Sequence, residues 1–236
     1  MGTASDACTK IHKGLRKALF ELSCCAGKTD GLSDDDVISL AKLFNEVMRF
    51  VELHNRNEEL YVLPLLVKKF SASSKRAEKE HFLIDKQIEF LKRNFNNLVS
   101  SSIKERKLKT EVFYHLLNDF ISAFLQNMLN RELDTSKLLR ENCSEDELNS
   151  SLKKFIKNTS PQDLMMMFRY ILPALNRTEV VELITHIKQT AHQPAFNAVM
   201  VLAGSILSAD EYDYLMENLI KKTGSTDKVW EAVAYQ

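Results

Sequence analysis

Apolar residues recurring at steps of three and four constrain the fold of this chain more than any other feature. The clearest stripe consists of Val37, Leu40, Leu43, Val47, Phe50, His54, Glu58, Tyr61 and Leu65. This spacing places one continuous face along an α-helix. Only 6 glycines and 4 prolines occur in 236 residues, which leaves few turn residues for a β-rich protein. The sequence therefore predicts an all-α fold.

Four long segments of this kind occupy the first 140 residues and are separated by short polar breaks. We expect helices over residues 6–25, 34–65, 75–98 and 104–140. Ser33 and the acidic residues after it are typical of a helix start, and Pro64 is expected to bend or tighten the last turn of the second helix. Long amphipathic helices joined by short loops favour an antiparallel up-down four-helix bundle.

From residue 144 the predicted helices become shorter and their starts are clearly marked. Capping boxes or an early proline mark helix starts at Ser144, Ser160, Asn176 and Ser208. We expect about five short helices, the last around Trp230. The sequence thus predicts two domains, a four-helix bundle at 1–141 and a helical extension at 144–236.

Charge, apolar runs and cysteine spacing exclude several kinds of partner. Lys and Arg number 32, as do Asp and Glu, so the chain lacks the basic surface of a nucleic-acid binder. No apolar run reaches the length of a membrane span, and the four cysteines show no zinc-type spacing. We expect a cytoplasmic protein with reduced thiols that contacts neither nucleic acid nor membrane. A protein partner or a homodimer contact stays open for the C-terminal helices.

Three histidines and one carboxylate fall on the inward faces near one end of the expected bundle. His54 and Glu58 are four residues apart and share a helix face. Counting along antiparallel neighbours places His12 and His81 near the same level. Imidazoles and carboxylates on facing bundle helices are the ligands of carboxylate-bridged di-iron sites. For His54 and Glu58 taken alone, a core histidine beside a surface glutamate is the alternative.

Seven short stretches together point to one family. They are residues 11–16, 26–30, 54–64, 80–81, 144–148, 172–175 and 194–196. In combination they resemble the hemerythrin-like (HHE) cation-binding proteins that carry a helical C-terminal extension. The resemblance implies a four-helix bundle that holds non-haem iron, with oxygen binding or iron and oxygen sensing as the usual roles. Dioxygen or another small diatomic molecule is the ligand that such a role implies.

The resemblance also implies a set of metal ligands. His12 and His54 correspond to ligands of one iron, and Glu58 corresponds to the bridging carboxylate. His81, with Asp85 four residues later, represents what remains of the second iron's ligand set. The first metal position is therefore better supplied than the second.

The fourth expected helix departs from the family pattern. Asn127 stands in the place of a histidine and Arg131 in the place of an acidic residue, and Glu132 follows directly. Asparagine binds iron weakly and arginine repels it. The pair His115 and Asp119 has the right spacing, but it lies about 18 Å away along the helix. Glu132 therefore remains the candidate ligand from this helix.

Three outcomes are open for the site. In the first, Glu132, Asp85 or water completes a di-metal centre. In the second, a single metal binds the three histidines and Glu58. In the third, the site is a vestige whose polar residues hydrogen-bond one another. In a metal-free site the substitution Glu58→Gln is expected to be neutral or mildly stabilising, since a poorly compensated buried charge is costly.

Two further alternatives come from other classes of protein. One is a haem-binding variant of the fold, for which the spare imidazoles are His115, His186 and His192. The other is a helical interaction protein with a degenerate metal site. The sequence contains no nucleophile elbow, phosphate-cradling glycine loop or Cys/His pairing. Binding or sensing is therefore favoured over turnover of an organic substrate.

Overall fold

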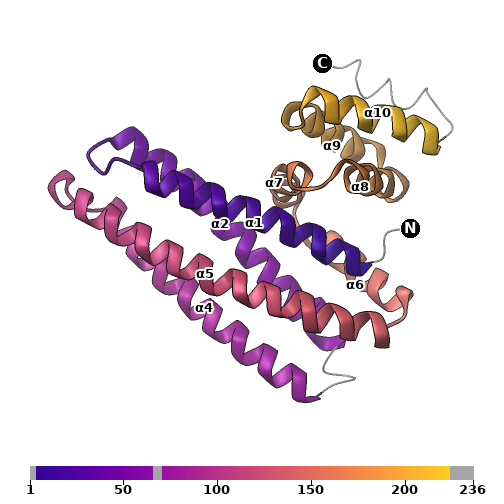
Figure 1. Cartoon of the computed structure of the whole chain (residues 1–236), viewed down its shortest axis with the longest axis horizontal. Coiled ribbons are helices and arrows are strands. Elements are labelled where there is room, and N and C mark those ends of the chain that lie inside the picture. The colour runs from indigo at the N-terminus through magenta and orange to yellow at the C-terminus, as the bar shows by residue number, and fades with distance from the viewer. Residues whose placement is uncertain (1–3, 66–70, 224–236) are drawn as a thin grey trace. The chain divides into compact units, whose positions relative to one another are not determined.

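The computed structural model describes residues 4–65 and 71–223. In chain order its helices are α1 (Ala4–Lys28), α2 (Asp34–Asn57), η1 (Glu58–Val62), α4 (Ser71–Val99), α5 (Ile103–Asn142), α6 (Glu145–Asn158), α7 (Pro161–Ile171), η2 (Leu172–Ala174), α8 (Arg177–Thr190), α9 (Gln193–Ile206) and α10 (Ala209–Thr223) (Figure 1). The short elements η1 and η2 are a π-helix and a 3-10 helix. The described residues form no strand, so the prediction of an all-α protein is confirmed. Among the helices of these two ranges, none has the length and apolar character needed to cross a membrane.

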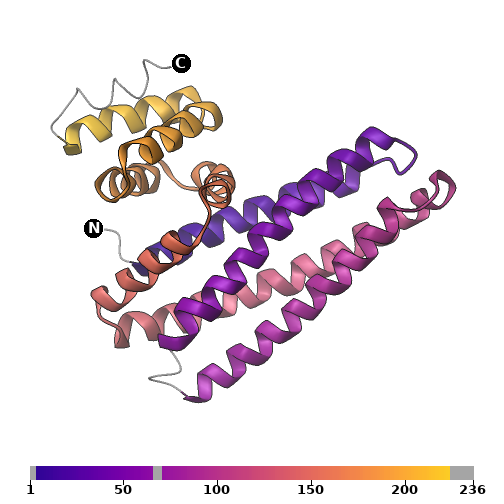
Figure 2. The same cartoon turned by 180° about the vertical axis from the view of Figure 1, so that it is seen from behind.

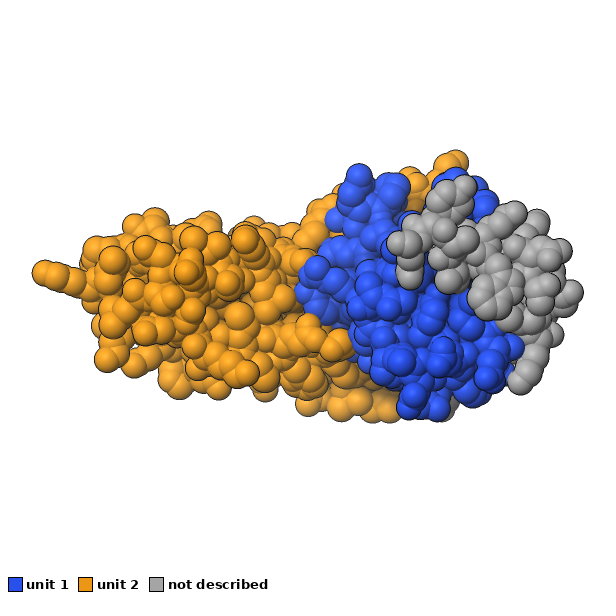
Figure 3. Space-filling model, turned by 90° about the horizontal axis from the view of Figure 1, so that it is seen from above, with its two compact units in different colours: residues 1–14, 159–236 blue, residues 15–158 orange. Residues whose placement is uncertain are grey.

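The chain forms two compact units, which Figure 3 shows in different colours. Unit 1 comprises residues 1–14 and 159–236, and unit 2 comprises residues 15–158. Helix α1 is unbroken and contributes residues to both units. In this division α6 belongs to unit 2 and residues 1–14 belong to unit 1, while the domain boundary near residue 141 stays a prediction. Within unit 2 the Ser151 hydroxyl donates to the Tyr61 carbonyl at 2.7 Å, and Asn158 Nδ2 donates to the Tyr61 hydroxyl at 2.9 Å.

The long helices of unit 2 run alternately up and down. The α1–α2 and α4–α5 loops lie at the same end of this unit in both views (Figures 1 and 2). Gly31 in the first loop is so close to α5 that an added Cβ would lie 2.8 Å from the Arg106 carbonyl oxygen. Arg106 also pairs with Asp34 at 2.6 Å. These contacts hold the loop end together, and the predicted antiparallel four-helix bundle is confirmed.

An aromatic cluster fills the interior of unit 2 toward its loop end. Phe44 stacks on Phe95 with ring centroids 4.0 Å apart, and Phe113 meets both rings at 5.5 and 5.0 Å. Such ring pairs add specific geometry to the burial of apolar area. Most of the inward positions expected from the sequence in this unit are buried, namely Leu15, Leu19, Leu22, Val37, Leu40, Val47, Phe50, Ile84, Ile88, Leu91, Phe95, Phe113, Leu117, Phe120, Phe124 and Met128.

Side chains cap the helices where the sequence predicts starts. The Ser33 hydroxyl accepts the backbone N–H of Asp36 at 3.2 Å and begins α2. Four other side-chain oxygens accept in the same way from the backbone N–H three residues later, namely those of Ser144, Ser160, Asn176 and Ser208. Each such cap satisfies a backbone donor that the first turn leaves open. The expected helix around Trp230 lies outside the described residues.

The second long helix changes its hydrogen bonding at Glu58. In η1 the backbone N–H of Leu63 donates to the carbonyl of Glu58, five residues earlier. Pro64 follows directly, and in an α-helix its ring would collide with the carbonyl four residues before it. A wider turn avoids that collision, so the expected bend or tightening at Pro64 is a widening instead. Single π-turns inside α-helices frequently occur at functional sites.

Unit 1 packs the start of α1 against the C-terminal helices. Gly14 lies so close to Ile171 that an added Cβ would lie 2.6 Å from the Ile171 side chain. Lys13 Nζ lies 2.6 Å from a carboxylate oxygen of Glu179 on α8. The first turns of α1 therefore belong structurally to unit 1.

Candidate metal centre

Helix α2 and the π-helix that follows it present an imidazole and a carboxylate on one face. His54 Nε2 lies 3.6 Å from Glu58 Oε1. The side chains of His54 and Glu58 are only 7% and 13% exposed. Phe124 of α5 meets the His54 ring edge-on, with ring centroids 6.3 Å apart. The polar pair is thus held inside the bundle against an aromatic neighbour.

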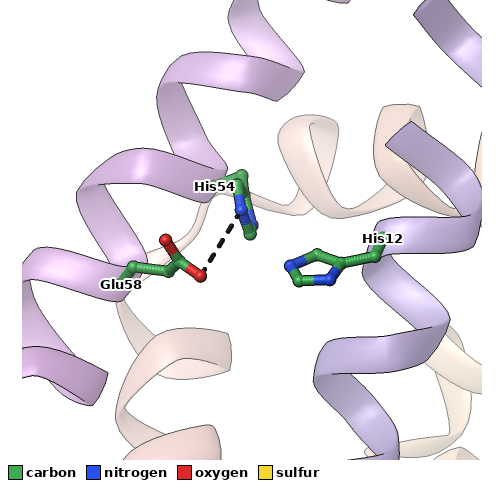
Figure 4. A group of neighbouring side chains, drawn as sticks. All are labelled: His12, His54 and Glu58. Carbon is green, nitrogen blue, oxygen red and sulfur yellow. Dashed lines mark ion pairs between the residues drawn. The ribbon is translucent and has the colours of Figure 1, made fainter. Parts of the chain in front are cut away.

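Helix α1 contributes a second buried imidazole to this group. One ligand atom from each of His12, His54 and Glu58 lies within 4.8 Å of the others. Figure 4 shows the three side chains pointing toward a common space. Ligand atoms bound about 2.1 Å from one ion are at most about 4.2 Å apart, so small side-chain rotations would bring all three onto a single cation. Two imidazoles and a carboxylate are the donor set of many non-haem ferrous sites, and the residues therefore fit one such ion.

Arg131 of α5 pairs with the same carboxylate. Its Nη1 forms an ion pair with Glu58 Oε2, and its side chain is 10% exposed. Burial lowers the pKa of Arg131 to about 10, so the guanidinium remains a cation at neutral pH. The resemblance to the family implies that Arg131 lies at this level, and the pair with Glu58 agrees with that height. Sequence reasoning missed the pairing itself, because it considered only the repulsion between Arg131 and a metal ion.

The other predicted ligands have different surroundings. Asp85 is exposed on α4. Glu132 accepts two hydrogen bonds of 2.8 Å from the guanidinium of Arg16. His81 lies in α4, and its side chain is outside what the structure describes. Among the described side chains, neither Asp85 nor Glu132 joins the group of His12, His54 and Glu58, and their roles as ligands stay predictions.

The spare histidines lie on the surface. His115, His186 and His192 are all exposed. His192 caps α9, because its Nδ1 accepts the backbone N–H of Ala195 at 3.2 Å. These surroundings are typical of ordinary surface histidines and give the haem alternative no support.

An antiparallel helical bundle that gathers two imidazoles and a carboxylate in its interior defines a class of cation-binding bundle proteins. The family model of the hemerythrin HHE cation binding domain matches residues 3–135. This match covers more than half of the chain, which belongs to the hemerythrin HHE family, as its motifs predict. Comparisons with curated proteins and with solved structures give no match. The helices from α6 onward lie beyond the matched residues.

Proposed function

We propose that this chain binds a non-haem iron ion and acts in the binding or sensing of oxygen, redox state or iron. The observation that carries the proposal is the convergence of His12, His54 and Glu58 inside a bundle of the HHE family. Neutral imidazoles together with one carboxylate suit ferrous iron and leave coordination positions open. Turnover of an organic substrate is not part of the proposal.

The protein groups have separate parts in holding the ion. Glu58 supplies the negative charge, and His12 and His54 supply neutral nitrogen donors. Phe124 limits the orientations of the His54 ring. When bound, iron would supply a one-electron redox couple and a place for dioxygen or another small diatomic molecule.

The thiols agree with a reducing compartment, and we place the protein in the cytoplasm. All four cysteines are free, which is the usual state of cytoplasmic thiols. Burial raises the pKa of Cys8 to about 11. Because the thiolate is the form that binds metals, Cys8 is a weak competitor for iron at neutral pH.

Iron content after loading tests the metal part of the proposal. The full chain is loaded with ferrous iron without oxygen, desalted and measured by mass spectrometry. We expect about one iron per chain, as the single donor set implies. His54→Ala should lose this iron, whereas His115→Ala, which removes an exposed histidine from the same bundle, should keep it. The proposal would be contradicted if wild type retained no iron after loading, or if folded His54→Ala retained as much iron as wild type is expected to hold.

Exposure of the loaded protein to air tests the oxygen part. The optical spectrum of iron-loaded wild type should change when dioxygen enters. Metal-free wild type and His54→Ala treated in the same way should show no such change. If the spectrum of the iron-loaded protein does not change with dioxygen, the proposal of oxygen binding is contradicted and that of iron binding is not.

The Arg131–Glu58 pair favours one alternative function. Because Arg131 neutralises Glu58 without a metal ion, the bundle can remain folded with an empty site. A helical interaction protein with a degenerate metal site would have this property. It would retain no iron after loading, and chelators would not alter its thermal stability.

A further inference from the structure

Glu58 divides its two carboxylate oxygens between different partners. Oε1 faces His54 Nε2 at 3.6 Å, whereas Oε2 pairs with Nη1 of Arg131. The side chains of Glu58 and Arg131 are 13% and 10% exposed. The single negative charge of Glu58 is therefore already balanced, inside the bundle, by a cation that belongs to the chain.

We propose that Arg131 is the built-in second cation of this site, so that Glu58 offers one oxygen to one metal ion and Arg131 competes with that ion. The inference rests on the proposed function for the metal position beside His12 and His54. It adds the stoichiometry of the site and the residue that sets the metal affinity.

Electrostatics gives the reason for this competition. Like charges a few ångströms apart repel strongly in a medium of low effective dielectric. A metal ion on Oε2 would have to displace the buried guanidinium, and an ion on Oε1 would share the carboxylate with it. Arg131 therefore excludes a second ion from its side of Glu58 and weakens the binding of the first.

The next residue of α5 forms an Arg–Glu pair of its own. The Glu132 carboxylate accepts two hydrogen bonds from the Arg16 guanidinium, each 2.8 Å long. Both of its oxygens thus accept from Arg16. Neighbouring positions on one helix hold two separate Arg–Glu pairs, of which only one includes a residue of the metal group.

Calorimetric titration of the full chain with ferrous iron, without oxygen, tests the inference. Wild type should bind one ion, and Arg131→Gln should bind it at least about tenfold more tightly because the competing charge is gone. Unchanged affinity in folded Arg131→Gln, or two ions bound by wild type, would overturn the inference.

Two matched variants separate charge from general loosening. Arg131→Lys keeps the positive charge and should bind iron nearly as wild type does. Arg16→Gln breaks the pair with Glu132 by the same substitution and should leave the iron affinity unchanged. An equal gain of affinity in Arg16→Gln would overturn the inference.

Folding provides a second measurement if Arg131→Gln is unstable without metal. Iron should then restore the circular dichroism spectrum of the folded variant. The bound ion would replace the positive charge of Arg131 beside Glu58. Failure of iron to rescue that variant would count against the inference.

The two proposals fail in different ways. Iron binding by Arg131→Gln but not by wild type supports the inference and removes iron binding by the native chain. Equal iron binding by wild type and Arg131→Gln supports iron binding by the native chain and overturns the inference. If neither protein binds iron, both proposals are overturned.

Discussion

The two halves of the bundle in unit 2 are built in opposite ways. Toward the loop end, the rings of Phe44, Phe95 and Phe113 pack against one another. Farther along the same bundle, Glu58 and Arg131 form a charge pair whose side chains are only 13% and 10% exposed. Apolar packing stabilises a fold by itself, whereas buried charges cost stability unless they are paired. The apolar half thus accounts for folding, and the polar half requires a reason beyond folding.

The largest expected effect lies in the apolar half. Phe44→Ala should lower the free energy of unfolding by about 3–5 kcal/mol, because it removes a buried ring and leaves a cavity. Urea denaturation measures this loss. Iron affinity of the folded variant should remain that of wild type. A change in iron affinity would show that the two halves are coupled.

In the polar half, the structure changes the expectation for Glu58→Gln in metal-free protein. The substitution leaves Arg131 buried without its counter-ion, so we expect a loss of about 3 kcal/mol in the free energy of unfolding instead of a neutral effect. Urea denaturation of chelator-treated protein measures it. The double variant with Arg131→Met should be more stable than Glu58→Gln alone, and an additive loss would argue against the pair.

Iron should stabilise the protein through the polar half alone. At a free concentration of 100 times its Kd, iron should raise the free energy of unfolding by about 2.7 kcal/mol. Phe44→Ala should gain the same increment, and His54→Ala should gain none. Thermal denaturation with and without ferrous iron provides the comparison. A gain in His54→Ala would place the binding elsewhere.

The smallest expected effect is at the loop end. Ser33→Ala removes the side-chain cap on the N–H of Asp36 and should cost about 1 kcal/mol. Ser100→Ala removes a hydroxyl that donates to the Asn96 carbonyl and caps no helix start, so its cost should be smaller. Both variants should bind iron as wild type does. Equal costs for the two serines would contradict the role of the cap.

The helices and the height of the polar group were predictable because an α-helix advances by a constant rise per residue. Counting along the chain therefore placed His12, His54 and Glu58 at one level without knowledge of side-chain conformations. The resemblance to the family placed Arg131 there as well. Its pairing with Glu58 depends on side-chain rotamers, which residue spacing does not give.

Other features depend on contacts that are distant in the sequence or on small angular differences. Glu132 is held by Arg16, which is separated from it by 116 positions. Asp85 follows the buried Ile84 directly, and one residue turns a helix by about 100°, which leaves Asp85 exposed. At Pro64, local sequence predicts a disturbance of the helix but does not choose between a bend and a wider turn.

The π-helix η1 holds one residue more than a regular α-helix would between the metal group and the contacts with α6. Glu58 at its start faces Arg131, and Tyr61 three residues later meets Ser151 and Asn158 of α6. A turn closed by a bond to the residue five positions earlier takes about one residue more than an α-turn for the same full rotation. Deleting one residue between Glu58 and Tyr61 would therefore restore α-helical bonding and leave the later part of the helix facing nearly the same way. The extra residue makes room before Pro64 without turning the rest of the helix away from its partners.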